Sequence, residues 1–238
     1  MPNDPLTIGI VGGMGPEATA DLFMKIIKAT PATRDQDHLP VVIVSDPSVP
    51  DRTQAVLADG EDPLPIMVRS ARACVRAGAD FLVMPCNTAH CFYSGLSESD
   101  GVPVLHMMEE VARFLEEEHP HIRRVGLLAT SGTVEIGLYQ EALSGNGIEV
   151  LLPDREDQER VMDGIYGDKG VKRGHYDEPR EMFVSVARDL IERGASAIIS
   201  GCTEIPLALS QKDLSDAVVI DPTEVLARAA VAHAKGER

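Results

Sequence analysis

The sequence has 238 residues, enough for one large domain or two small ones, and 44% of them are hydrophobic, which suits a globular protein with a substantial core. It contains no run of about 18 apolar residues, and its first residues lack a signal-peptide pattern, so we expect a cytoplasmic protein without a membrane span. The formal net charge of −16 argues against nucleic acid as a partner and means that an anionic ligand would need specific Arg or Lys side chains.

Short apolar runs alternate with longer segments of helical periodicity along the whole chain. In chain order, the apolar runs predict strands at residues 7–12, 41–46, 81–85, 103–106, 124–129, 147–152, 196–200 and 217–221. The helical patterns predict helices at residues 15–30, 62–77, 106–119, 133–145, 155–166, 178–193, 204–210 and 222–235. This alternation predicts an α/β protein with parallel sheets, and strands that are apolar throughout indicate helices on both faces. The longest polar, Gly-rich break, at residues 167–177, is typical of a loop near a site.

One pattern of glycine, apolar strand and cysteine occurs twice. In RAGADFLVMPCNT, Gly78 comes eight residues before Cys86, and in ERGASAIISGCTE, Gly194 comes eight residues before Cys202. A second pair of similar segments, IGIVGGMGPEAT and VGLLATSGTVEI, opens the two halves at nearly the same offset. Two matched offsets indicate an internal duplication.

The duplication predicts two similar α/β lobes. We expect the first lobe to comprise residues 1–105 and 208–238, and the second to comprise residues 106–207. Ligands of open α/β sheets bind beyond the carboxyl ends of the strands, where Cys86 and Cys202 are both predicted to lie. If the lobes face each other through those ends, the two cysteines line one cleft from opposite sides.

A pair of thiols on opposite walls of a cleft suits the inversion of a carbon centre. Helix N–H groups near a cysteine favour its thiolate, which can remove a proton from one face of the carbon while the opposite thiol delivers one to the other face. The resting pair then holds one thiolate and one thiol and titrates as a coupled system. Fixed donors must stabilise the developing negative charge. The side chains that suit this role are Asn87, Thr88, Thr130, Ser131 and Thr203.

Several of these residues also have a plainer interpretation. A free cysteine is often only a small buried hydrophobe, and we expect this of Cys74 and Cys91, which lack the repeated context. Thr130 and Thr203 could cap helices, and Glu204 could lie in a first helical turn for reasons of the helix dipole.

The sequence gives little support for a metal or a nucleotide. Neither the four cysteines nor His90, His106 and His175 show metal-ligand spacing, so we assign no metal site. The glycine-rich turn GGMGPEAT at residues 12–19 could cradle a phosphate, but it matches neither GxGxxG nor the phosphate loop that ends in Gly-Lys-Ser/Thr.

Five motifs in order resemble the aspartate/glutamate racemase family. They are GGMGPEAT (12–19), DRT (51–53), PCNTAH (85–90), IYGDKGVKRG (165–174) and GCTEIPL (201–207). The resemblance spans nearly the whole chain and is to the aspartate-racemase branch, which includes broad-specificity amino-acid racemases. It implies two pseudo-symmetric lobes, each with a parallel flavodoxin-like sheet, an active site in the cleft between them, racemisation without a cofactor, and a homodimer.

The resemblance also implies roles for individual residues. It makes Cys86 and Cys202 the acid/base pair, with Cys86 deprotonating the D-enantiomer and Cys202 the L-enantiomer. Arg52 and Lys172 fall where the family binds a side-chain carboxylate, although without a ligand an exposed Arg or Lys would form only a weak surface ion pair or be solvated. Met14 would line the pocket. The residues that would hold the amino-acid carboxylate and amine are Asn87, Thr88, Thr130 and Thr203.

The sequence departs from the glutamate racemases of the cell-wall pathway. They carry Ser in the first turn and His two residues after the second cysteine, where this chain has Gly-Met-Gly and Glu204. It also keeps both cysteines, whereas the arylmalonate decarboxylases keep one. We therefore predict an isomerase, a cofactor-independent amino-acid racemase with aspartate or glutamate as the favoured substrate.

Three alternatives stay open. One is a broad-specificity amino-acid or hydantoin racemase with the same cysteine pair, although a hydantoin has no free carboxylate to bind Arg52 and Lys172. The second is a non-catalytic binder of small carboxylates, in which the cysteines are incidental. The third is a nucleotide-binding α/β protein that uses the glycine-rich turn.

Overall fold

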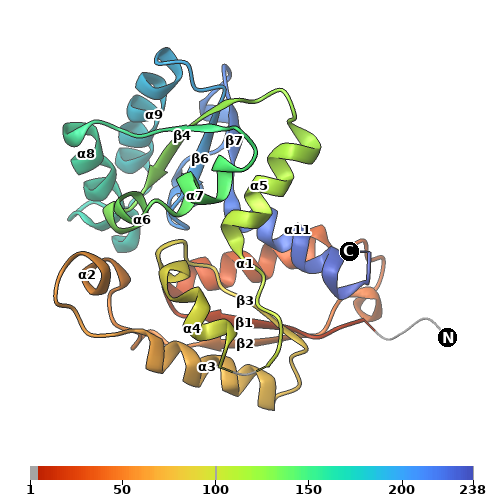
Figure 1. Cartoon of the computed structure of the whole chain (residues 1–238). Coiled ribbons are helices and arrows are strands. Elements are labelled where there is room, and N and C mark those ends of the chain that lie inside the picture. The colour runs from red at the N-terminus through yellow and green to blue at the C-terminus, as the bar shows by residue number, and fades with distance from the viewer. Residues whose placement is uncertain (1–4, 100, 238) are drawn as a thin grey trace. The chain divides into compact units, whose positions relative to one another are not determined.

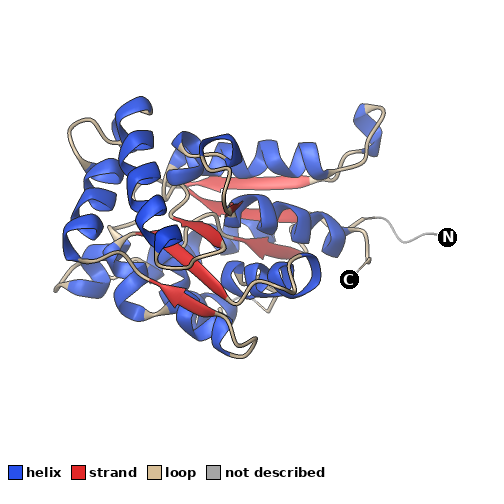
Figure 2. Ribbon diagram, turned by 90° about the horizontal axis from the view of Figure 1, so that it is seen from above, coloured by secondary structure: helices blue, strands red, loops and turns tan. Residues whose placement is uncertain are grey.

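The chain folds into two compact units, each with its own parallel sheet (Figure 1). The computed structural model describes residues 5–99 and 101–237. One unit contains the residues up to Glu110 and those from Thr223 onward, and the other contains Val111–Pro222. Figure 2 shows strands (red) with helices (blue) packed along them, which confirms the predicted α/β class. None of the helices within the described ranges is long and apolar enough to cross a membrane.

The first unit has a three-stranded sheet in the order β2-β1-β3. Its parallel strands are β1 (Ile8–Gly12), β2 (Val41–Ser45) and β3 (Phe81–Val83), and every residue of the central strand β1 is buried. Its helices are α1 (Pro16–Ala29), α2 (Arg52–Leu57), α3 (Leu64–Arg76), α4 (Tyr93–Ser97) and α11 (Pro222–Ala234), with the 3-10 helices η1 (Asp35–Asp37) and η2 (Thr88–Phe92). The helix α5 (Met107–Glu118) carries the chain from this unit into the second.

The second unit has a four-stranded parallel sheet in the order β5-β4-β6-β7. The strands are β4 (Arg124–Ala129), β5 (Glu149–Leu151), β6 (Ala197–Gly201) and β7 (Val218–Ile220). The helices are α6 (Ser131–Ile136), α7 (Leu138–Ser144), α8 (Arg155–Tyr166), α9 (Asp177–Glu192) and α10 (Ile205–Ala208), with the 3-10 helices η3 (Val171–Arg173) and η4 (Gln211–Asp213). The first three strands of each unit therefore share one order, with the first strand in the centre, as in flavodoxin-like sheets.

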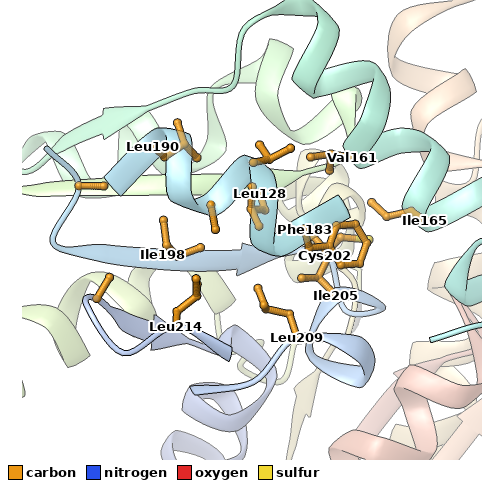
Figure 3. Close-up of a cluster of buried hydrophobic side chains, with 14 of the residues drawn as sticks. Leu128, Val161, Ile165, Phe183, Leu190, Ile198, Cys202, Ile205, Leu209 and Leu214 are labelled. Atoms are coloured by element: carbon orange, nitrogen blue, oxygen red, sulfur yellow. The ribbon is translucent and has the colours of Figure 1, made fainter. Parts of the chain in front are cut away.

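The core of the second unit brings β4 and β6 against α8 and α9 (Figure 3). Leu128, Phe183 and Ile198 are fully buried in this cluster, and each contributes about 2 kcal/mol through the hydrophobic effect. Cys202 belongs to the same cluster, beyond the end of β6. The second of the paired cysteines is thus anchored in the core of its own unit.

Glycines of the sequence repeat have matching structural roles in the two units. Gly78 and Gly194 follow α3 and α9 with φ of 100° and 101°, a conformation that L side chains rarely adopt. Gly9 and Gly126 lie in the central strands β1 and β4, where an added Cβ would come within 2.6 Å and 2.7 Å of a side chain on the neighbouring strand. The repeated glycines therefore mark the same turn and the same close approach twice.

The structure differs from the predicted elements in several places. The predicted strand at 103–106 is only a single bridge between Leu82 and Val104. The predicted helix at 133–145 is two helices, because Gly137 adopts φ of 77° and ends the first of them. The sequence pattern also misses the short helices α2 and α4 and the 3-10 helices η1, η2, η3 and η4, which are too short to show helical periodicity.

The two units also differ in their limits from the expected lobes. The sequence assigns 208–238 to the first lobe, but β7 pairs in parallel with β6, so the chain stays in the second unit up to Pro222. The earlier crossing lies inside α5, between Glu110 and Val111, rather than before residue 106.

Candidate active site

Cys86 lies in the turn that follows β3. Its backbone N–H donates to the carbonyl of Met84 at 2.9 Å, and η2 begins two residues later at Thr88. The side chains of Cys86, Asn87 and Thr88 are all buried, with 6%, 2% and 5% of their surface exposed. The local arrangement is therefore a buried thiol between a strand end and a helical turn, as the sequence predicts for this segment.

Met14 and Arg52 belong to the same part of the first unit. Met14, in the turn after β1, lies in one buried cluster with Cys86 and Val49. The guanidinium of Arg52 donates to the carbonyls of Val49 at 3.2 Å and Pro50 at 2.9 Å, and to the carbonyl of Met14 at 3.3 Å. Arg52 therefore joins the glycine-rich turn to the loop before α2.

His90 is a residue of this region to which the sequence assigns no role. Its ring is buried in η2, with Nδ1 2.8 Å from the carbonyl oxygen of Cys86 and Nε2 3.1 Å from the N–H of Met107. Burial, and then the neighbouring His106, lower the pKa of His90 to about 3. The only sequence signal for this contact is the spacing of four residues from Cys86, which suffices to bring a side chain back over a helical turn.

Cys202 occupies the matching position in the second unit, directly after β6. Because Ala129 at the end of β4 pairs with Gly201 at the end of β6, Thr130 and Cys202 leave adjacent strand ends. Cys202 is 7% exposed, and its Sγ donates a hydrogen bond to Oε2 of Glu204 at 3.0 Å. Both repeated cysteines are thus buried just beyond the carboxyl end of the third strand of their unit.

The buried carboxylate of Glu204 accepts hydrogen bonds from several side chains. Besides Cys202, the hydroxyl of Thr203 donates to Oε2 at 3.3 Å, and the ammonium of Lys172 pairs with Oε1. Lys172 comes from η3 and lies 5.4 Å from the centre of the Tyr166 ring. Lys172 therefore forms an ion pair inside the protein, although the resemblance implies a substrate carboxylate as its partner.

This environment fixes the protonation of Cys202. Burial is the largest cause that raises its pKa well above the ordinary value of a thiol, and the charge of Glu204 adds to it, while Lys172 acts in the opposite direction. Cys202 is therefore held as the neutral thiol. The sequence does not single out Tyr139 and Asp221, which interact electrostatically here. Burial raises the pKa of Tyr139 well above its usual range, and the charge of Asp221 adds to this effect.

Thr130 and Ser131 begin α6. The hydroxyl oxygen of Thr130 accepts from the N–H of Thr133 at 3.4 Å, so the capping interpretation of this residue holds. The hydroxyl oxygen of Ser131 accepts from Nε2 of Gln158 at 3.3 Å. Both residues thus lie at the strand end next to Cys202 but are engaged in local hydrogen bonds.

The other two cysteines have surroundings that fit packing. Cys74 is fully buried, and its Sγ lies 3.6 Å from the carbonyl of Ile10. Cys91 is half-buried, and burial raises the pKa of both thiols to about 11. Within residues 5–99 and 101–237, no three His, Cys, Asp or Glu side chains group in a way that could hold a metal ion.

Comparison with known proteins supports the likeness seen in the motifs. A model of the "Asp/Glu/Hydantoin racemase" family matches residues 11–230. The broad-specificity amino-acid racemase RacX of Bacillus subtilis is 30% identical over 228 residues, which cover 94% of this chain and 96% of the relative. The solved structure of Picrophilus torridus aspartate racemase superposes with a TM-score of 0.86 at 32% identity, covering 97% of this chain and 94% of that one.

A more distant comparison concerns the fold alone. The glutamate racemase of Francisella tularensis, solved in complex with D-glutamate, has a TM-score of 0.69 at 14% identity and covers 100% of this chain. Matched over most of its length by the family model and by RacX, this chain belongs to the Asp/Glu/hydantoin racemase family.

Proposed function

We propose that this protein is an amino-acid racemase that acts on aspartate or glutamate without a cofactor and uses Cys86 and Cys202 as its two acid/base groups. The observation that carries the proposal is the matched position of the two thiols. Each is buried directly beyond the third strand of its unit, β3 or β6, where ligands of α/β sheets bind.

In the proposed reaction the cysteines act on opposite faces of the α-carbon. A thiolate at Cys86 takes the α-proton of the D-enantiomer, the C–H electron pair stays on the α-carbon, and the Cys202 thiol gives its proton to the other face. The reverse sequence converts the L-enantiomer. The raised pKa of Cys202 supports its role as the resting thiol. This mechanism requires both sulfurs to reach the same α-carbon.

The proposed carboxylate and amine contacts follow from the same two strand ends. Asn87 and Thr88 are buried beside Cys86, and Thr130 and Thr203 lie beside Cys202. Their amide and hydroxyl groups suit a developing carbanion whose charge spreads onto the α-carboxylate. In the same proposal, Met14 lines the pocket and Ser131 and Glu204 complete its polar wall.

The choice of substrate depends on Arg52 and Lys172. We propose that these cations bind a side-chain carboxylate, as aspartate and glutamate would supply. One observation favours a broader substrate range. Glu204 already neutralises the ammonium of Lys172, so a substrate with an uncharged side chain would not leave that ammonium without a counter-charge. The 30% identity to a broad-specificity racemase supports this second candidate.

The function is tested by proton exchange at the α-carbon. Purified protein, without pyridoxal phosphate, is incubated in D2O with single enantiomers of each common amino acid, and α-proton loss is followed by NMR. We expect exchange with inversion for aspartate or glutamate, and exchange of several neutral amino acids as well if the range is broad. Absence of exchange with every amino acid would refute the racemase assignment and leave a binder of small carboxylates.

The assembly and location of the enzyme are part of the same proposal. We expect a homodimer, which light scattering of the purified protein would measure directly. A cytoplasmic location agrees with four cysteines that are all free thiols, since a reducing compartment preserves them. Fractionation of cells that produce the protein would test it.

A further inference from the structure

We infer that His90 is a positioning residue for Cys86, which it holds through the carbonyl of the Cys86–Asn87 peptide. The inference rests on the proposed function, because it assigns His90 a part in that reaction. His90 does not touch the thiol itself; both of its ring nitrogens contact backbone groups.

The partners of the ring determine where its proton lies. The N–H of Met107 can only donate, so Nε2, 3.1 Å away, must be the unprotonated acceptor. A neutral imidazole then carries its proton on Nδ1, which donates to the carbonyl oxygen of Cys86 at 2.8 Å. A charged ring would carry protons on both nitrogens and could not accept from Met107.

This bridge fixes the orientation of one peptide group. The carbonyl oxygen of Cys86 accepts a hydrogen bond from His90, and the N–H of Cys86 donates to the carbonyl of Met84 at 2.9 Å. The backbone on both sides of the thiol is therefore restrained. Rotation of the Cys86 carbonyl would turn the N–H of Asn87 with it, since the peptide is planar. His90 therefore restrains both the backbone that carries the Cys86 thiol and the peptide plane shared with Asn87.

Neighbouring rings hold the imidazole in place. His90 stacks with Tyr93 at 6.4 Å and meets the edge of His106 at 4.9 Å. The hydroxyl of Tyr93 donates to the carbonyl of Val104 at 3.0 Å. The ring is thus supported on several sides, which is what a group that positions another residue requires.

Two substitutions separate the two ring contacts. In His90→Asn the side-chain amide lies near the position of Nδ1 and keeps a donor for the Cys86 carbonyl. In His90→Gln the amide oxygen lies near the position of Nε2 and keeps the acceptor for Met107. The matched control is Tyr93→Phe, which removes the hydrogen bond to Val104 from the same cluster but touches no group of Cys86.

The readout is an elimination that needs only one cysteine at a time. With D- or L-3-chloroaspartate, removal of the α-proton lets the electron pair form a C=C bond as chloride leaves the β-carbon. The enamine then reacts with water and releases ammonia and oxaloacetate, so both chloride and oxaloacetate can be measured. Cys86→Ala and Cys202→Ala identify which enantiomer each cysteine processes.

We expect His90→Gln to slow the Cys86-dependent elimination by about 10- to 100-fold, because a displacement of a catalytic group by about 1 Å has an effect of this size. The Cys202-dependent elimination should stay within about twofold of the wild-type rate. His90→Asn should restore most of the Cys86-dependent rate, and Tyr93→Phe should change neither. Equal losses for both enantiomers, or no loss, would overturn the inference. Wild-type protein that processes neither enantiomer and exchanges no α-proton would overturn the proposed function itself.

A measurement on the wild-type protein keeps the inference testable even if a variant fails to fold. Long-range proton–nitrogen NMR spectra of protein with 15N-labelled histidine report which nitrogen of each ring is protonated. We expect one buried ring with its proton on Nδ1, assigned to His90 by its contact with Met107. A His90 ring protonated on Nε2 would refute the positioning role.

Discussion

The thiol of Cys202 donates a hydrogen bond to the carboxylate of Glu204, with 3.0 Å between Sγ and Oε2, while the other carboxylate oxygen pairs with Lys172. A negative charge on the sulfur would be repelled by the negative charge of the carboxylate. Burial is the largest cause that raises the pKa of the thiol, and Glu204 raises it further. Lys172 reduces this effect without removing it. The three side chains form one electrostatic unit that keeps a proton on Cys202.

Replacing Glu204 by glutamine should therefore activate the Cys202 thiol. Glutamine keeps a hydrogen-bond acceptor but removes the repelling charge, so the pKa of Cys202 should fall and alkylation by iodoacetamide should accelerate. At a pH below the pKa, we expect about threefold for each unit of pKa, because the thiolate fraction rises about tenfold while the nucleophilicity of the thiolate falls. Mass spectrometry of the digested protein measures the rate for each cysteine, and Cys86 serves as the internal control. An unchanged rate at Cys202 would mean that Glu204 does not hold its proton.

The effects of replacing Lys172 and Glu204 on the free energy of unfolding should be non-additive, because the two side chains form an ion pair. Lys172→Met leaves the buried carboxylate without its cation and should lower the free energy of unfolding by about 2–3 kcal/mol, somewhat less than for a fully buried pair because the Lys172 side chain is 25% exposed. Adding Glu204→Gln should recover most of this loss. Urea unfolding of the two single variants and the double variant measures the coupling. Strictly additive losses would show that the two side chains act independently.

Much of the fold follows from the sequence because the deciding features are local. The apolar strands and the glycines Gly78 and Gly194 are visible as runs and offsets, and the structure gives both glycines the same positive φ. The boundary near residue 208 is not visible, because it depends on whether β7 pairs with β6, and a three-residue strand carries no signal of its partner.

Within the candidate site, the sequence identifies types of residue but not their partners. Both cysteines stand out as repeated strand-end residues, so their burial beyond β3 and β6 is predictable. The contact of Lys172 with Glu204 joins residues 32 positions apart on a loop and a strand end, and no periodicity encodes it. His90 is overlooked because its partners are backbone groups, and its spacing of four residues from Cys86 does not by itself identify them.

The two proposed acid/base cysteines should be separable from the packing cysteines by mutation. Cys86→Ala and Cys202→Ala should each lower racemisation by at least about 10³-fold, because in the proposed mechanism each removes the acid/base group that acts on one face of the carbon. Cys74→Ala is the matched control: it removes a buried sulfur beside Ile10 and should reduce stability but not the rate. The circular dichroism signal of the substrate follows the interconversion of its enantiomers. Normal interconversion by either active-site variant would refute the two-base mechanism.

The neutral ring of His90 should make the protein sensitive to acid. Its pKa is about 3 in the folded protein, and about 6.5 is expected in the unfolded chain, so between these values the unfolded state binds the extra proton. The free energy of unfolding should then fall as the pH decreases below about 6.5, by up to about 1.4 kcal/mol per pH unit. His90→Asn cannot titrate, so its urea midpoint should fall less steeply than that of the wild type over this range. All other titrating groups are common to both proteins, so the difference between the two curves isolates His90. Parallel curves would show that folding does not lower the pKa of this ring.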